Sequence, residues 1–245
     1  MSGHSKWSTI KHQKATADQK RGKVFSKVAK AISVAAKDGQ SGDPGKNSRL
    51  RLVIEQAKSV NMPKQNIQRA IERGLGRGEG AGLETIFYEG FGPERIAVVV
   101  ECVTDNKNRT TSEVKSFFER GGGNLGAPRS ASYLFEKKGL ILVEKKKDAQ
   151  EQILKLIDLG IEDIEEDELL IEVYTKAEEL EKFKNEMEKL GFIIKEASLV
   201  LKAKTFIPIE NKEKKEKILK FLEGLEDLED TQKVYCNADF ITEEN

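Results

Sequence analysis

The sequence GLGRGEGAG, residues 74–82, separates two stretches of the chain that differ in character. Five of its nine residues are glycine, and it shows no apolar periodicity. We predict a flexible linker here, and therefore a domain boundary. Because helical periodicity precedes this stretch and β-rich runs follow it, we expect the fold to change here from a helical domain to α+β domains.

Three helices are predicted before the linker. Between residues 18 and 38 apolar side chains recur at helical spacing, and Gly39 follows as a C-terminal stop. A turn at 42–45 leads to a second amphipathic pattern at 50–60, and a third short helix is predicted at 63–74. Three helices with short connections form a small bundle.

Strands predominate after the linker. We predict a hairpin with strands at 86–88 and 96–103, followed by a helix that begins near Asn108 and ends at the glycines 121–123. The further predicted elements are strands at 133–135 and 140–143, a helix at 149–159, strands at 161–164 and 169–174, a helix at 177–190, an extended stretch at 192–209, a helix at 212–225 and a strand at 233–237.

This order of elements indicates two α+β domains of the split βαβ, or ferredoxin-like, kind. We therefore predict an α+β multidomain protein in which an N-terminal three-helix bundle precedes two such domains. The bundle with its N-terminal tail is assigned to residues 1–80.

Composition excludes several classes of protein. A hydrophobic fraction of 38% suits globular folding, and no apolar run is long enough to span a membrane. The N-terminus lacks the apolar segment of a secretory signal, so we expect a cytoplasmic protein. Cys102 and Cys236 have no neighbours at metal-ligand spacing, so both are expected to be buried, reduced thiols. Nothing in the sequence indicates the oligomeric state.

The net charge of zero conceals two oppositely charged parts. Residues 1–80 contain 17 Lys and Arg against 6 Asp and Glu, whereas the remaining 165 residues contain 25 against 36. The first part therefore carries +11 and the second −11. Such asymmetry points to an anionic partner for the basic part, most often nucleic acid. The alternative is that the basic and acidic domains attract each other.

Helical geometry concentrates the positive charge on one side of the first predicted helix. At about 100° per residue, Lys20, Lys23, Lys27, Lys30 and Lys37 share an arc of roughly 100° opposite the apolar stripe. Such a face can follow a run of phosphates and release their counterions. The candidate nucleic-acid-binding residues are His4, Lys6, Trp7, Lys11, Lys14, Lys20, Arg21, Lys23, Lys27, Lys30, Arg49, Arg51, Arg69, Arg73 and Arg77.

Trp7 is the only tryptophan of the chain and lies among these basic residues. An exposed indole beside cations can stack on an unpaired base. The alternative is that it packs onto the helical bundle. The arginines add planar guanidinium groups, which suit phosphate better than ammonium groups do.

Residues that could support catalysis or hold a metal or cofactor are sparse. The two histidines, His4 and His12, lack a neighbouring cysteine or carboxylate cluster, so we predict no metal site and no cofactor. The glycine-rich stretches at 42–48 and 74–78 lack the preceding strand that nucleotide-binding loops require. The stretch 121–126 contains a G-x-x-G, which in KH domains joins two helices, but here we expect a strand after it.

An enzyme is a further alternative, which would use Asp105, Asn106 and Arg109 in a cleft between the α+β domains. The competing role for these residues is to cap the helix that follows Val103 and to fix its turn. We predict a non-enzymatic protein and assign no catalytic residue.

Several motifs resemble those of the YebC family, densely over the first 130 residues and more sparsely to the end. They are GHSKW at 3–7, DQKRGKVFSK at 18–27, GDP at 42–44, NMP at 61–63, RAI at 69–71, YEGFGP at 88–93 and TDNKNRT at 104–110. One segment departs from the pattern: residues 127–131 read APRSA, where relatives usually carry a Gly-Ser-Val-like turn.

The resemblance implies three domains, with the last inserted within the middle one: 1–80, then 81–134 with 206–245, and 135–205. Members are described as probable DNA-binding transcriptional regulators, and also as ribosome-associated translation factors that include a mitochondrial translational activator of cytochrome c oxidase. We therefore expect a regulator that binds DNA through the basic N-terminal domain, with binding to ribosomal RNA as the alternative. The implied partners are nucleic acid and the transcription machinery or ribosome, and no membrane.

Overall fold

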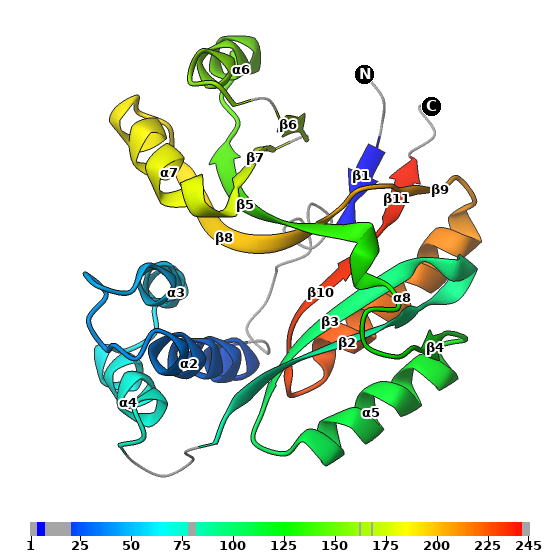
Figure 1. Cartoon of the computed structure of the whole chain (residues 1–245). Coiled ribbons are helices and arrows are strands. Elements are labelled where there is room, and N and C mark those ends of the chain that lie inside the picture. Colours follow the sequence, from blue (N-terminus) through cyan, green and yellow to red (C-terminus); the bar gives the residue numbers. More distant parts are fainter. Residues whose placement is uncertain (1–3, 8–20, 78–81, 162, 168, 242–245) are drawn as a thin grey trace. The chain divides into compact units, whose positions relative to one another are not determined.

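A computed structural model describes residues 4–7, 21–77, 82–161, 163–167 and 169–241 of the 245 (Figure 1). The chain forms two compact units, each described by itself below. The first combines the described residues up to Leu134 with those from Ala203 onwards, and the second comprises Phe135–Lys202. None of the described helices is both long enough and apolar enough to cross a lipid bilayer.

The three predicted N-terminal helices are present as α2 (Arg21–Asp38), α3 (Ser48–Ser59) and α4 (Lys64–Gly74). Their apolar stripes meet in a core that includes the fully buried Ile32 and Leu50. The Asn47 side chain caps α3 by accepting a hydrogen bond from Leu50 N (3.0 Å), and it donates to Ala35 O of α2 (2.8 Å).

Gly74 brings α2 and α4 into close backbone contact. A Cβ atom at this position would lie 2.1 Å from the carbonyl oxygen of Ser33, so no larger residue fits without moving a helix. Gly74, the first residue of the predicted linker, is thus part of the packing between two helices. Residues 78–81 of the predicted linker lie outside the described residues.

The next part of the first unit is a four-stranded antiparallel sheet in the order β10-β3-β2-β4. Its strands are β2 (Glu84–Phe91), β3 (Ala97–Thr104), β4 (Asn124–Leu125) and β10 (Thr231–Cys236). Two helices, α5 (Lys107–Arg120) and α8 (Lys212–Asp227), cover one face (Figure 1). Phe118 of α5 and Phe221 of α8 meet edge to face, with ring centroids 5.3 Å apart.

A second, three-stranded sheet has the order β1-β11-β9. Its strands are β1 (His4–Lys6), β9 (Ile207–Ile209) and β11 (Ala238–Ile241). Pairing is antiparallel between β1 and β11 and parallel between β11 and β9. The sequence patterns predict neither β1 nor β11, because strands of three or four residues carry too little periodicity to be recognised.

The second unit has the split βαβ topology expected of a ferredoxin-like domain. Its elements are β5 (Phe135–Glu144), α6 (Ala149–Asp158), β6 (Asp163–Glu166), β7 (Leu170–Lys176), α7 (Leu180–Lys189) and β8 (Ile194–Ala203). The strand order is β6-β7-β5-β8. The two strands predicted at 133–135 and 140–143 are instead one continuous strand, β5, preceded by a short 3-10 helix at Ser132–Leu134.

We expect Gly74→Ala to destabilise the protein, although alanine normally stabilises a helix relative to glycine by about 1 kcal/mol. The added methyl group would force α4 away from the Ser33 carbonyl. Gly22→Ala is the matched control, because nothing lies within 4 Å of a Cβ atom there. Urea denaturation should show a lower free energy of unfolding for the first variant and an unchanged or higher one for the second. An equally stable Gly74→Ala variant would contradict the close helix contact.

Candidate nucleic-acid interface

Three lysines of α2 contact an acidic segment of the same unit, residues 226–230, which comprises the end of α8 and the connection to β10. Lys30 Nζ lies 2.7 Å from Asp230 Oδ1, and Lys27 Nζ donates a hydrogen bond to the carbonyl of Glu226. Lys23 Nζ lies 3.6 Å from Asp227 in an exposed pair. The attraction between basic and acidic segments, which the sequence left open as the alternative, therefore accounts for the contacts of these lysines.

Lys37 is also engaged, because its Nζ donates to the carbonyl of Leu83 at 2.7 Å. Beside it, Val34 of α2 is buried with Leu83 and Val103. Lys27, Lys30 and Lys37 of the predicted lysine face therefore lie at a junction with the α+β part of the unit, whereas Lys23 stays largely exposed and Lys20 lies outside the described residues.

Asp230 is the centre of this junction, with a side chain only 2% exposed. Its Oδ1 accepts from Lys30, while its Oδ2 accepts from Arg109 Nη2 (2.8 Å), Thr110 Oγ1 (2.7 Å) and Thr104 Oγ1 (3.1 Å). Burial opposes ionisation of this carboxyl, but the hydrogen bonds from Arg109, Lys30 and Thr110 outweigh it and hold the pKa of Asp230 well below its usual range.

The residues considered for an enzyme site belong to this structural network. Asn106 Oδ1 accepts from Arg109 N (3.1 Å) and so caps α5, which is the competing role predicted from the sequence. Arg109 joins Asp105 (3.1 Å) to the buried Asp230. These groups therefore position the start of α5 and the segment before β10.

We expect Asp230→Asn to lower the free energy of unfolding by about 3 kcal/mol or more, because it leaves Lys30 and Arg109 beside a neutral partner. Asp227→Asn, which removes the exposed pair with Lys23, should cost less than about 1 kcal/mol. Urea denaturation of both variants measures the difference. Equal losses would show that burial of Asp230 contributes nothing.

Stability should also fall in acid because of Asp230. Its folded-state pKa lies below the unfolded value of about 3.9, so its stabilisation is present above that pH and is lost progressively as the pH falls below it. The free energy of unfolding should therefore decrease more steeply below about pH 4 in the parent protein than in Asp230→Asn. Parallel pH profiles would contradict this assignment.

Trp7 is buried, with 5% of its surface exposed, in the core that also contains Phe240 and Phe221. Its position follows from β1, which pairs with β11 and draws the N-terminal segment into the α+β part of the unit. The prediction of an exposed ring that stacks on a base is therefore wrong. Trp7 packs into a core, as the alternative supposed, but this core is that of the α+β part and not that of the helical bundle.

The remaining predicted residues lie in different parts of the chain. His4 and Lys6 lie on β1, and Arg21 begins α2. Lys11, Lys14 and Lys20 lie outside the described residues. Arg49 pairs with Asp38 at 2.7 Å, and Arg51 donates to the carbonyl of Pro44 at 2.9 Å. Arg69 and Arg73 lie on α4, and Arg77 lies just after it.

The outer side of α4 presents polar and basic groups. Ile67, Ala70 and Ile71 face the bundle core, and at about 100° per residue Asn66, Arg69 and Arg73 then share an arc of about 60° away from it. Gln65, Asn66 and Arg69 are exposed. Amide side chains beside guanidinium groups are the combination that reads base edges next to phosphates.

Two further exposed lysines belong to these two helices: Lys58 near the end of α3 and Lys64 at the start of α4. Within the described part of the chain, Lys58, Lys64 and Arg69 have no hydrogen-bond or ion-pair partner. We call Lys58, Lys64, Arg69, Arg73 and Arg77 the α3–α4 basic surface. Neither Lys58 nor Lys64 was among the residues predicted from the sequence, whereas the apolar spacing of Ile67, Ala70 and Ile71 locates Arg69 and Arg73 away from the core.

The glycines after α5 terminate that helix. Gly122 has φ +79°, and Gly123 N donates to Phe118 O at 2.9 Å, which is the hydrogen bond of a Schellman motif. The expected strand follows as β4. The G-x-x-G therefore ends a helix.

The two cysteines differ in burial. Cys102 is buried as expected, which raises its thiol pKa to about 12, but Cys236 is only half-buried.

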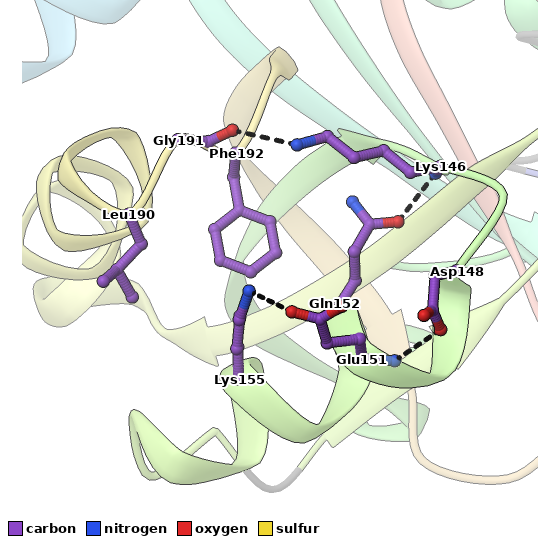
Figure 2. A pocket seen from close by; sticks show the side chains of 8 residues that line it. All are labelled: Lys146, Asp148, Glu151, Gln152, Lys155, Leu190, Gly191 and Phe192. Atoms are coloured by element: carbon purple, nitrogen blue, oxygen red, sulfur yellow. Dashed lines mark hydrogen bonds and ion pairs between the residues drawn. The ribbon is translucent and has the colours of Figure 1, made fainter.

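One pocket of about 160 Å³ lies in the second unit, between the start of α6 and the end of α7 (Figure 2). It is lined by Lys146, Asp148, Glu151, Gln152, Lys155, Leu190, Gly191 and Phe192. Lys155 pairs with Glu151 at 2.6 Å, and Asp148 caps α6 by accepting from Glu151 N at 3.2 Å. The pocket is smaller than the roughly 300 Å³ typical of small-molecule sites, and these polar groups bind one another.

Comparison with known proteins gives matches over nearly the whole chain. A family model described as "TACO1/YebC protein N-terminal domain" matches residues 5–77. A second model, described as "TACO1/YebC second and third domain", matches residues 83–238. A "Probable transcriptional regulatory protein" from Persephonella marina is 49% identical, covering 98% of this chain and 96% of its own, and one from Chloroflexus aggregans is 46% identical, covering 99% and 97%.

A solved structure is similar throughout. The crystal structure of a conserved hypothetical protein from Aquifex aeolicus has a TM-score of 0.89 and 45% sequence identity, and the match covers 97% of this chain and 98% of that one. The similarity includes the helical bundle as well as the α+β parts.

Proposed function

The chain belongs to the TACO1/YebC family, and from that premise we propose that it is a non-enzymatic regulator that binds nucleic acid through the α3–α4 basic surface. The observation that carries the proposal is the presence of exposed cations on this surface without partners among the described residues. When unpaired cations bind a phosphate backbone, they release its counterions without breaking a contact within the protein. The paired lysines of α2 would first have to give up their present partners, so their binding would be weaker.

This proposal moves the main nucleic-acid contact from α2 to α3 and α4. Lys27 and Lys30 hold the bundle against residues 226–230, whereas Arg69, Arg73 and Arg77 keep the role expected from the sequence. Lys11, Lys14 and Lys20 remain predicted phosphate contacts.

DNA is the first candidate partner, because relatives that are nearly half identical are named probable transcriptional regulatory proteins. The exposed Gln65 and Asn66 favour it as well, since amides of this kind can read adenine in the major groove. Ribosomal RNA is the second candidate. The observation that favours it is the exposed ring of Tyr133, which suits unpaired bases.

Reversing three charges of the surface should weaken binding. We expect the variant Lys58→Glu, Lys64→Glu, Arg69→Glu to bind a 20-base-pair DNA duplex at least tenfold more weakly. The slope of log K against log salt should fall by roughly 2 to 3, because each lost phosphate contact contributes about 0.9. Fluorescence anisotropy over a salt series measures both quantities.

The matched control is Lys212→Glu, Lys217→Glu, Lys220→Glu, which changes the net charge equally on exposed positions of α8. If this control weakens binding as much as the first variant, the effect is one of net charge and the proposed surface is refuted. The same titration with ribosomal RNA, together with sedimentation with ribosomes at low salt, separates the two candidate partners. A protein that stays at the top of the gradient excludes the ribosomal one.

A further inference from the structure

We propose that residues 126–134 form a second nucleic-acid contact, in which the ring of Tyr133 stacks on an unpaired base and Arg129 and Lys204 contact the flanking phosphates. This inference rests on the proposed binding of nucleic acid. It adds a preference for single-stranded regions, which the α3–α4 basic surface does not supply.

Tyr133 is the first observation. Its side chain is 63% exposed, more than that of Phe87 (48%), and these two are the exposed aromatic residues of the described chain. A tyrosine normally buries most of its ring, because the ring provides a large apolar area. An exposed aromatic ring beside cations is the platform on which proteins stack bases of single strands.

The backbone around Tyr133 is held firmly. Glu89, which is 7% exposed, accepts hydrogen bonds through its carboxylate from Ala131 N (3.0 Å) and Ser132 N (2.7 Å). Its carbonyl accepts from Gly126 N at 2.8 Å. These bonds lock both ends of residues 126–132 onto β2. A ring presented from an ordered backbone loses less conformational entropy on binding than one on a mobile loop.

Lys204 places a positive charge next to Tyr133. Its Nζ donates to the carbonyl of Tyr133 at 2.9 Å, and its backbone N donates to the carbonyl of Leu134 at 2.8 Å. The lysine is exposed, and its ammonium group has further N–H donors that a phosphate oxygen can accept.

Arg129 is exposed and has φ +70°, a left-handed conformation that is unfavourable for residues other than glycine. Backbone strain of this kind persists where the surrounding structure imposes it, and it concentrates at binding sites. Residues 120–134 contain two arginines and no acidic residue, although residues 81–245 as a whole carry more Asp and Glu than Lys and Arg. The local charge thus favours a polyanion over an acidic or neutral protein surface.

The test compares two probes: a fluorescein-labelled 12-nucleotide oligouridylate and a 12-base-pair RNA duplex. Tyr133→Leu should raise the Kd for the oligouridylate about 5- to 100-fold and leave that for the duplex within about twofold. Tyr133→Phe should bind as the parent does, since it keeps the ring. Phe87→Leu is the matched control, because it removes the other exposed aromatic ring.

An unchanged Kd for oligouridylate in Tyr133→Leu overturns the proposal, and so does an equal loss for both probes. Failure of the parent protein to bind oligouridylate also overturns it and leaves the ring as a protein contact. The α3–α4 charge reversal distinguishes the two proposals. If that variant retains duplex binding while Tyr133→Leu loses the single strand, the basic surface is refuted and the Tyr133 site stands.

Discussion

The ion pair between Lys30 and Asp230 is the contact on which the arrangement of the first unit depends. It joins residues 200 positions apart, and it combines a fully buried carboxylate with a lysine side chain that is 13% exposed. Taking a carboxylate out of water is costly, so it requires several partners at once. Arg109, Thr104 and Thr110 supply them, and because these residues surround the start of α5, one buried charge fixes the bundle, the helix and the segment before β10 together.

This arrangement bears on how charge is distributed in a chain of zero net charge. Part of the positive charge of the bundle is used inside the protein, against residues 226–230. Among the cations that stay exposed, Lys58, Lys64 and Arg69 on α3 and α4 have no hydrogen-bond or ion-pair partner among the described residues. Electrostatic attraction within the chain thus determines which cations stay available to an external polyanion.

Amphipathic spacing made most of the fold predictable. Helices α2 to α5 and α8 were expected because their apolar side chains recur every three or four residues over ten or more positions. Strands β1 and β11 were not, since they are short and pair across the whole chain. The same limit applies to the site: helical geometry placed Lys27 and Lys30 on one face, but the sequence could not reveal that Lys30 pairs with Asp230 and that Lys27 donates to the carbonyl of Glu226.

The pairing of β1 with β11 has a consequence for synthesis of the protein. The two strands are separated by about 230 residues, so β1 lacks this partner until β11 leaves the ribosome. At 5 to 20 residues per second this takes roughly 10 to 50 seconds. The helices of the bundle can form long before that, while residues 226–230, which contact Lys23, Lys27 and Lys30, are still unmade. The nascent chain therefore passes through a period in which Lys23, Lys27 and Lys30 lack these partners.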